Sequence, residues 1–319
     1  MKFTLASMAL LAAPFTAAIK APNADGMKII WQEDFAGSSG SSPNSKTWNI
    51  ARHIDTNNEL QDYSPSNKNI QLSGGDTLQL VPWKEKDKWT SGRIETKDSW
   101  TPEKGKKMRF QAGLRMGEAA NQKGMWPAFW MLGDAIRHGT EWPLCGELDI
   151  FEQVNGDGIG HGTVHCDAEE GGACSEPLGR GASTDIPDGN FHSWSLVVDR
   201  TSGDWRQETI EWARDGNVFH KLSGAEIGSE GVWSTLAHSP YYILLNVAVG
   251  GNWPVSSPLC TPSCLPHMNP NDCAGQPRQV HRRRLRQHAG GAIRCRLREL
   301  LGYRAHQSIS SFHFAYIYM

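Results

Sequence analysis

The sequence predicts an all-β fold, a two-sheet antiparallel β-jelly-roll sandwich, on the basis of three observations. From about Ile29 to Pro254 the chain consists of short, alternating apolar runs separated by turns of Gly, Asn, Asp and Pro. No segment has the periodicity of a long helix, and the sequence contains no internal repeat. With 319 residues, the chain is long enough for one large domain. Many short strands at this spacing are typical of packed sheets.

The first residues have the composition of a secretory signal peptide. Lys2 is followed by the apolar run Leu5–Phe15 and then by the small residues Ala17 and Ala18. The run is too short to span a bilayer, and no later stretch of the sequence is long enough. We therefore expect a signal peptide over residues 1–18 and a secreted, extracellular protein that does not bind a membrane.

The cysteines fit an oxidising compartment. There are seven of them, and an odd number leaves one unpaired. Cys166 and Cys174 bracket a short Gly-rich loop and are the expected disulfide, whereas the other pairings stay open. Cys260 and Cys264 lack a second pair at zinc-ligand spacing, so we expect no metal among the site residues.

Local patterns predict individual strands and one hairpin. Thr77–Val81 and Trp194–Val198 have the apolar content of strands. Asp215-Gly216-Asn217 separates Thr209–Trp212 from Val218–His220, and Asp-Gly is favoured in two-residue hairpin loops. The sequence therefore predicts a hairpin that turns at Asp215-Gly216.

Three carboxylates lie within six residues of an otherwise apolar, strand-like run, from Glu147 to Glu152. Alternation places Glu147 and Asp149 on one face of a strand and Ile150 in the core. It would also place Glu152 in the core, where an unpaired charge is very costly. We therefore predict a β-bulge near Ile150 and Phe151, which returns Glu152 to the face of Glu147. A solvated acidic face or a metal-binding strand could contain the same six residues. The flanking sequence is therefore needed to choose between these alternatives and a catalytic strand.

The flanking sequence resembles glycoside hydrolase family 16, and within it the fungal laminarinase-type endo-β-1,3(4)-glucanases. The resemblance covers roughly residues 29–254 and rests on Asn57–Tyr63, Thr90–Ile94, Gly124–Leu132, Trp142-Pro143, Glu147–Glu152, Gly162–His165 and Leu245–Pro254. It implies a concanavalin A-like sandwich. It also implies a secreted, retaining endo-glucanase that hydrolyses β-1,3 or mixed β-1,3/1,4 glucan by double displacement.

The resemblance gives each acid a separate role. Glu147 matches the nucleophile, Glu152 the general acid/base, and Asp149 the helper carboxylate between them. A retaining glycosidase needs its two carboxyl groups ~5–5.5 Å apart, one to attack the anomeric carbon and one to protonate the leaving oxygen. Glu152 must hold a proton at working pH, and an apolar wall and neighbouring negative charge would both raise its pKa.

Further residues match the family's substrate cleft. Indole rings stack on the apolar faces of sugars, and Arg and short polar side chains hold hydroxyls. The expected substrate-binding residues are Asn57, Glu59, Arg93, Trp126, Trp130, Trp142, His165 and Trp253. Each of these tryptophans could instead be a core aromatic. For Trp48, Trp194 and Trp212 core packing is the expectation, and His192 is interpreted as structural.

The resemblance implies no cofactor for the chemistry. A structural calcium ion on the outer sheet face is compatible with the family but unsupported here, because the acid that contributes to it usually lies on a last strand that this sequence does not recognisably contain. The expected partner is a β-glucan polysaccharide, bound by a monomer, with no nucleic acid and no membrane. Two alternatives stay open: a non-catalytic β-glucan-binding lectin on the same fold, and a cell-wall glucan transglycosylase.

The composition changes after Pro254, which ends the predicted catalytic domain at residues 19–254. In residues 255–319 nine Arg, no Lys and two acids give a charge of +7, which leaves −9 for the rest of the chain. The basic run lacks the interleaved aromatic residues of a nucleic-acid site. Because the change occurs where the family has its closing strand, we expect a gene-model error. If the tail is real, Phe312–Tyr318, which alternates like an edge strand, is the only candidate replacement.

Overall fold

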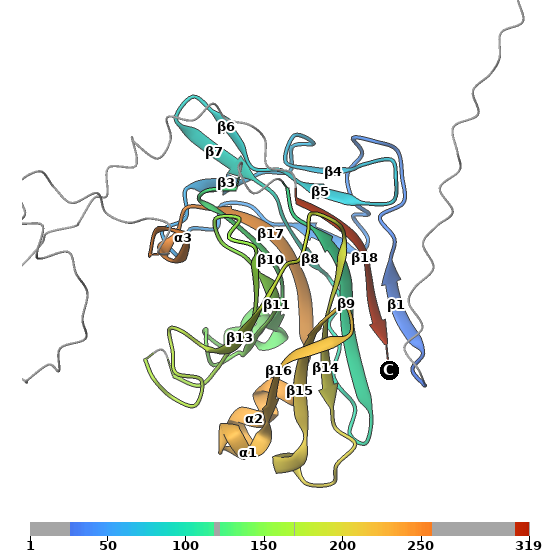
Figure 1. Ribbon diagram of the computed structural model, residues 1–319, viewed down its shortest axis with the longest axis vertical. Coiled ribbons are helices and arrows are strands. Elements are labelled where there is room, and N and C mark those ends of the chain that lie inside the picture. Colours follow the sequence, from blue (N-terminus) through green and yellow to red (C-terminus); the bar gives the residue numbers. More distant parts are fainter. Residues whose placement is uncertain (1–25, 118–121, 169, 257–309, 319) are drawn as a thin grey trace, which may run out of the picture.

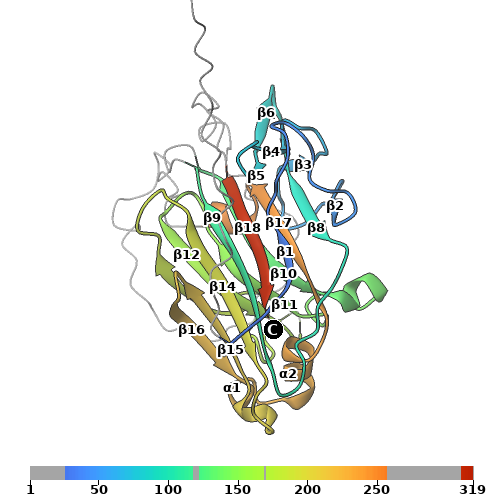
Figure 2. The same cartoon turned by 90° about the vertical axis from the view of Figure 1, so that its right-hand side faces the viewer.

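The computed structural model describes residues 26–117, 122–168, 170–256 and 310–318. They form two large antiparallel sheets packed face to face, which confirms the predicted β-sandwich (Figures 1 and 2). The expected signal peptide at 1–18 lies outside the described residues, as do Cys260, Cys264 and the basic stretch within 257–309.

The back sheet has eight strands among the described residues. They are β1 (Ile29–Glu33), β4 (Ile70–Leu72), β5 (Leu78–Leu80), β9 (Lys107–Arg115), β14 (His192–Asp199), β15 (Thr209–Arg214), β16 (Asn217–Ser223) and β18 (Ser310–Tyr318). Their order is β16-β15-β14-β9-β18-β5-β4, and β1 pairs with β18. Asp215 and Gly216 both have positive φ, at 49° and 79°. The hairpin predicted at these residues is therefore confirmed.

The front sheet has seven strands in the described part of the chain. They are β2 (Trp48–Ile50), β8 (Arg93–Thr96), β10 (Met125–Gly133), β11 (Glu147–Glu152), β12 (Ile159–His165), β13 (Arg180–Asp185) and β17 (Tyr241–Val249). Their order is β13-β12-β11-β10-β17-β8-β2. The acidic strand β11 therefore lies near the middle of a strongly curved sheet, between β10 and β12 (Figure 1).

Smaller elements cap the ends of the sandwich. A third sheet joins β3 (Gln61–Tyr63), β7 (Lys88–Ser91) and β6 (Trp83–Glu85). The helical segments are η2 (Asp134–His138), η3 (Trp205–Gln207), α1 (Gly224–Ile227), α2 (Glu230–Ala237) and α3 (Asn252–Ser256). None of the helices in the described ranges is long and apolar enough to cross a membrane.

The core lies between the two large sheets and is rich in aromatic residues. Trp194 and Trp212 from the back sheet and Phe129 and Phe151 from the front sheet are each at most 1% exposed. Trp48 is also buried, and its indole Nε1 donates to Glu33 at 2.9 Å. The three tryptophans assigned to the core from sequence are therefore core residues.

Strand β18 differs from the sequence expectation. Phe312–Tyr318 alternates like an edge strand, yet β18 lies inside the back sheet (Figure 2). It pairs with β9 on one side, and on the other with β5 through residues 310–312 and with β1 through residues 315–318. The edge-strand interpretation was wrong because alternation reports which face is apolar, whereas sheet position depends on partners distant in sequence. A closing strand is thus present.

Candidate active site

Strand β11 contains the predicted bulge. Against β10, Phe129 faces Phe151 and Trp130 faces Asp149, so Ile150 is an extra residue with no partner of its own. Against β12 the register likewise shifts between Asp149 and Glu152. The bulge sends Ile150 and Phe151 into the core, each 0% exposed. Glu152 consequently faces the same way as Asp149, which confirms the parity prediction.

The three acids enter one cavity of about 320 Å³ on the outer face of the front sheet, which we call the acidic cleft. The cleft brings together most of the residues expected from sequence. Those that line it are Asn57, Glu59, Arg93, Trp126, Trp130, Trp142, Glu147, Asp149 and Glu152. The three cleft tryptophans are only partly buried and line the cavity, which favours a cleft role over packing in the core.

His165 and Trp253 are not among the residues that line this cavity, but both contact residues that do. His165 Nε2 lies 3.5 Å from Asp149 Oδ2, and its ring packs 5.7 Å from the Trp142 ring. Trp253 packs edge-on against Trp126 with ring centroids 5.5 Å apart. The two residues therefore contact side chains that line the cleft.

Glu152 has the environment of a carboxyl group that holds a proton near neutrality. It is 8% exposed, and Trp126 Nε1 donates to its Oε1 at 2.8 Å. Burial raises the pKa of Glu152 to about 7, assisted by the charge of Glu147 and opposed by the Trp126 hydrogen bond and by His165.

Glu147 and Asp149 are also harder to ionise than free carboxyl groups. Burial raises the pKa of Glu147, while the positive charges of His165 and Arg93 oppose that rise. Burial and the charges of Glu152 and Glu147 raise the pKa of Asp149 well above its usual value. Asp149 Oδ2 has no hydrogen-bond partner among the described residues. His165 and Arg93 thus favour the ionised form of Glu147, whereas the charges that shift the pKa of Asp149 all come from acids.

A polar network forms the other wall of the cleft. The Arg93 guanidinium lies 4.9 Å from the Trp130 ring centre, and Trp130 Nε1 donates to Asn246 Oδ1 at 2.6 Å. Asn246 Nδ2 donates to the Tyr63 hydroxyl, which in turn donates to Glu59 at 3.3 Å. Glu59 and Arg93 are thereby fixed relative to the indole between them.

The loop that carries Asn57 docks on a glycine pair after β17. Asn57 has φ 52°, a conformation that Asn tolerates better than most residues. Its carbonyl accepts from Asn252 N–H at 2.9 Å. A Cβ on Gly251 would lie 3.3 Å from the Trp126 ring and 3.4 Å from the Asn57 carbonyl, so glycine permits this close approach.

Sequence reasoning did not single out Asn246, Tyr63 or Glu176. Asn246 had a usable signal, because it is the one polar residue in the nine-residue strand Tyr241–Val249, which is buried throughout. Glu176 had none, since it lies in a loop eleven residues from His165, the residue that it contacts at 2.7 Å. That loop contains the predicted disulfide Cys166–Cys174, which is present.

Glu147, Asp149 and His165 each place one donor atom within 4.8 Å of the others, which is compact enough for a metal ion. Their neighbours fit acid–base chemistry better. Glu147 is hydrogen-bonded by the Trp142 side chain, and His165 Nδ1 is engaged with Glu176. We therefore do not assign these side chains as metal ligands. The expectation about calcium on the outer sheet face stays untested.

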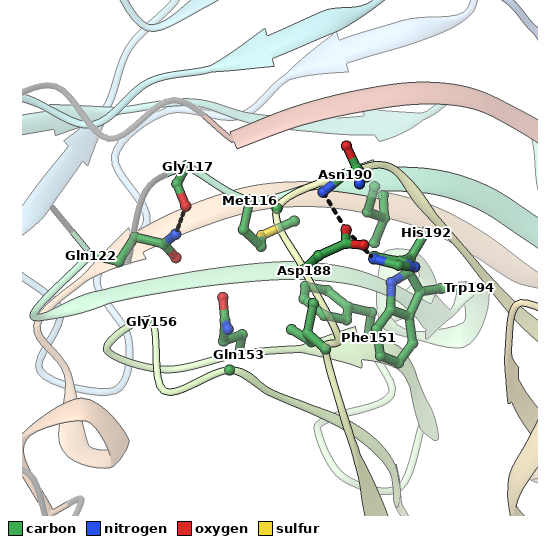
Figure 3. A pocket seen from close by; sticks show the side chains of 14 residues that line it. Met116, Gly117, Gln122, Phe151, Gln153, Gly156, Asp188, Asn190, His192 and Trp194 are labelled. Carbon is green, nitrogen blue, oxygen red and sulfur yellow. Dashed lines mark hydrogen bonds and ion pairs between the residues drawn. The ribbon is translucent and has the colours of Figure 1, made fainter. Parts of the chain in front are cut away.

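A second cavity, of about 240 Å³, lies on the core side of β11 (Figure 3). Phe151, Trp194 and Gln153 line it, together with His192 and Asp188. The His192 ring contacts Asp188 at 3.1 Å and Asp215 at 2.7 Å, which fits its expected structural role. The carboxylates of β11 face the acidic cleft and not this cavity.

Known proteins match the chain in sequence and in fold. A family model described as "XgeA-like, catalytic GH16 domain" matches residues 56–194. Beta-glucanase from Rhodothermus marinus is 30% identical over 249 residues, which cover 73% of this chain and 78% of that protein. Glucan endo-1,3-beta-glucosidase A1 from Niallia circulans is 28% identical over 266 residues, which cover 73% of this chain but 35% of that protein. The chain thus spans about a third of that second relative's length. The endo-1,3-beta-glucanase structure from Streptomyces sioyaensis has a TM-score of 0.73 at 27% identity, covering 96% of this chain and 99% of that one.

Proposed function

The chain belongs to glycoside hydrolase family 16, and on that premise we propose that it is a retaining endo-glucanase of the fungal laminarinase type. Its proposed substrate is a β-1,3 or mixed β-1,3/1,4 glucan. The names of the relatives, a beta-glucanase and a glucan endo-1,3-beta-glucosidase, support this substrate class. The observation that carries the proposal is the bulge at Ile150, which directs Glu147, Asp149 and Glu152 into one cleft.

In the first step Glu147 attacks the anomeric carbon as a carboxylate. Glu152 transfers its proton to the glycosidic oxygen, the bond from that oxygen to the anomeric carbon breaks, and the leaving sugar departs as an alcohol. A covalent ester then joins Glu147 to the remaining sugar. The positive charges of His165 and Arg93 favour the ionised Glu147 that this attack needs.

In the second step Glu152, now a carboxylate, removes a proton from water. The water oxygen attacks the anomeric carbon, and Glu147 departs as a carboxylate, so both groups return to their starting states. Two inversions give net retention. Asp149 lies between the two glutamates on the same face, and burial together with their charges raises its pKa, which favours a protonated helper carboxyl group.

The pH dependence follows from these protonation states. Activity needs Glu147 ionised, and because burial raises its pKa the acid limb lies above the value of a free glutamate. Activity also needs Glu152 protonated, and a pKa of about 7 places the basic limb near neutrality. The proposal therefore predicts a mildly acidic optimum.

The cleft tryptophans and Arg93 suit a sugar chain. Trp126, Trp130 and Trp142 expose part of each ring to the cavity, which allows stacking on the apolar faces of sugars. Trp126 and Trp130 use their indole Nε1 within the protein, so they offer ring surface more than hydrogen bonds. Asn57 and Glu59 supply polar groups at the opposite wall.

The test is hydrolysis of laminarin, with the first-formed anomer followed by NMR. The proposal predicts that the β-anomer forms first, and an α-anomer formed first would contradict it.

Glu147→Gln should remove activity while glucan binding persists. Glu141→Gln is the matched control, because Glu141 is an exposed glutamate in the loop just before β11 and should leave turnover unchanged.

The same assay separates the alternatives. A transglycosylase would pass the sugar from Glu147 to an added oligosaccharide in place of water, and longer products would appear. A lectin would bind laminarin without turnover in the wild-type protein. Both glutamates that the chemistry needs are in the cleft, which favours an enzyme over a lectin, and the products decide whether water or a sugar is the acceptor.

We propose a secreted monomer that needs no cofactor. The Cys166–Cys174 disulfide supports an oxidising compartment. Amino-terminal sequencing of secreted protein tests the cleavage expected near Ala18, and gel filtration tests the monomer. Dialysis against EDTA should leave laminarin hydrolysis unchanged, since no proposed step uses a metal ion.

We also propose that a gene-model error, such as a read-through intron, accounts for the basic composition that begins at Val255. The closing strand Ser310–Tyr318 lies inside the back sheet, so the proposed inserted segment ends before it. Sequencing of the mature transcript tests this. A message that encodes residues 255–309 unaltered would contradict the proposal.

A further inference from the structure

His165 is held from both sides by acidic side chains. Its Nδ1 lies 2.7 Å from Glu176 Oε2, and its Nε2 lies 3.5 Å from Asp149 Oδ2. The Glu176 side chain is 0% exposed and that of His165 is 13% exposed. Since a carboxylate only accepts hydrogen bonds, Glu176 requires a proton on Nδ1, which leaves Nε2 directed at Asp149.

The loop that carries Glu176 is held in place by a disulfide and by hydrogen bonds. Glu176 Oε1 accepts from the Cys166 backbone N–H at 2.8 Å, and Cys166 forms the disulfide with Cys174. Gly171 and Glu176 exchange two backbone hydrogen bonds, of 2.9 and 2.7 Å. The carboxylate therefore has a fixed position beneath the imidazole, although it lies outside the regular strands.

We propose that Glu176 is a positioning residue for the glycosidase reaction, because it holds His165 with a proton on Nδ1 and Nε2 directed at Asp149. The inference rests on the function proposed above. The loop that contains the Cys166–Cys174 disulfide would then have a role in that function, because its Glu176 sets the charge and orientation of the His165 imidazole beside the catalytic acids.

The charges around His165 come from two elements and determine its effect. Glu147, Asp149 and Glu152 face it from β11, and Glu176 faces it from the loop. Arg93 on β8 also acts on Glu147. Burial opposes a charged imidazole, but the hydrogen bond to Glu176 and the acids of β11 raise the pKa of His165. When charged, the imidazole stabilises Glu147 as a carboxylate.

Glu176→Gln tests the proposal with little change in shape. The amide oxygen can still accept from Cys166 N–H, but the amide nitrogen then faces Nδ1 and disfavours a proton there. His165 would lose its charge at lower pH. The His165 charge lowers the pKa of Glu147 more than the Glu176 charge raises it, so the acid limb of kcat/KM should move up. We expect a shift of about 1 pH unit, and roughly tenfold lower kcat/KM on that limb.

Glu170→Gln is the matched control. Glu170 is an exposed glutamate of the same disulfide loop, so its substitution removes one charge without touching His165. Its pH profile should overlay the wild-type profile. An equal shift in both variants, or a Glu176→Gln variant that loses activity with no change in the profile, would overturn the proposal.

A ¹⁵N NMR titration of His165 in the wild-type protein decides the point without any substrate or variant. The neutral imidazole should carry its proton on Nδ1, and a proton on Nε2 would overturn the proposal even if Glu176→Gln fails to fold. In Glu176→Gln the titration should move to lower pH. If the wild-type protein hydrolyses no glucan, the proposed function fails, while the titration still judges the Glu176–His165 assignment.

Discussion

The two faces of strand β11 carry opposite kinds of side chain on one backbone. The cleft face presents Glu147, Asp149 and Glu152, whereas the core face presents Ile150 and Phe151, both fully buried. Regular alternation could not separate them this way, and the bulge at Ile150 makes both patterns compatible. The spacing of the acids is therefore set by packing on the other side of the sheet.

The back sheet supports the bulge directly. Trp212 Nε1 donates to the backbone carbonyl of Asp149 at 2.7 Å. A Cβ on Gly162 of β12 would lie 2.5 Å from the Trp212 ring, so glycine makes room for this indole. The Phe151 and Trp194 rings pack 4.6 Å apart next to it. Substitutions on the cleft face should therefore affect activity, and substitutions on the core face should affect stability.

After Glu147→Gln, the largest effect is expected for Glu152→Gln. Loss of the proton donor should lower kcat/KM by roughly 10²–10⁴-fold at the pH optimum. The basic limb near pH 7 should disappear with it, because that limb reports the ionisation of Glu152. Initial rates on laminarin across pH measure both. If the variant kept the basic limb of the pH–rate profile, a residue other than Glu152 would be the general acid.

On the core face, Phe151→Ala should lower the free energy of unfolding by about 3–5 kcal/mol, because a fully buried ring is removed and leaves a cavity. Urea titration measures this change. Phe191→Ala is the control, since Phe191 is 37% exposed and its loss should cost far less. Equal losses in the two variants would contradict the division of β11 into two faces.

Glu152 should also make stability depend on pH. Its folded pKa of about 7 is above the unfolded value, so the folded state binds the proton more tightly. The stabilisation is present below the unfolded pKa of about 4.3 and is lost as pH rises through about 7. Glu152→Gln should flatten this decline in unfolding free energy between pH 5 and 8, by about 2–3 kcal/mol. A decline of unchanged size in the variant would assign it to other groups.

The smallest effect is expected for Trp212→Phe, which leaves the buried Asp149 carbonyl without its indole donor. We expect a loss of about 1–3 kcal/mol in unfolding free energy, together with a several-fold fall in kcat as the bulge relaxes. Trp194→Phe removes the same ring area under β12 without touching Asp149, so it should spare kcat. If both variants lose kcat equally, the hydrogen bond from Trp212 to the Asp149 carbonyl does not contribute to turnover.

Sequence alone predicted features that depend on near neighbours. The bulge followed from the parity of three acids, the hairpin from Asp215-Gly216, and the disulfide from two cysteines around one loop. Features that depend on distant pairing were missed. Strand β18 lies between β9 and both β5 and β1, and no local pattern indicates those partners. Glu176 reaches His165 only because the disulfide loop folds back under β12.

The same distinction applies to the candidate site. Trp126, Trp130 and Trp142 come from segments that the family resemblance covers, and all three line the cleft. Trp253 was placed there by the same reasoning, yet it packs edge-on against Trp126 and is not among the residues that line the cavity. Sequence position identifies a segment near the site, but which side chain reaches the cavity depends on the turn at Gly250 and Gly251, both with positive φ.

The central claim is that Glu147 is the nucleophile on the cleft face of a bulged strand. A 2-deoxy-2-fluoro laminaribiosyl fluoride tests it most directly. Fluorine at carbon 2 slows both steps, whereas the good fluoride leaving group speeds formation of the glycosyl-enzyme alone, so the ester accumulates. Peptide mass spectrometry of the inactivated protein should find one sugar ester, on Glu147. A label on Glu152, or on any residue outside strand β11, would contradict the account.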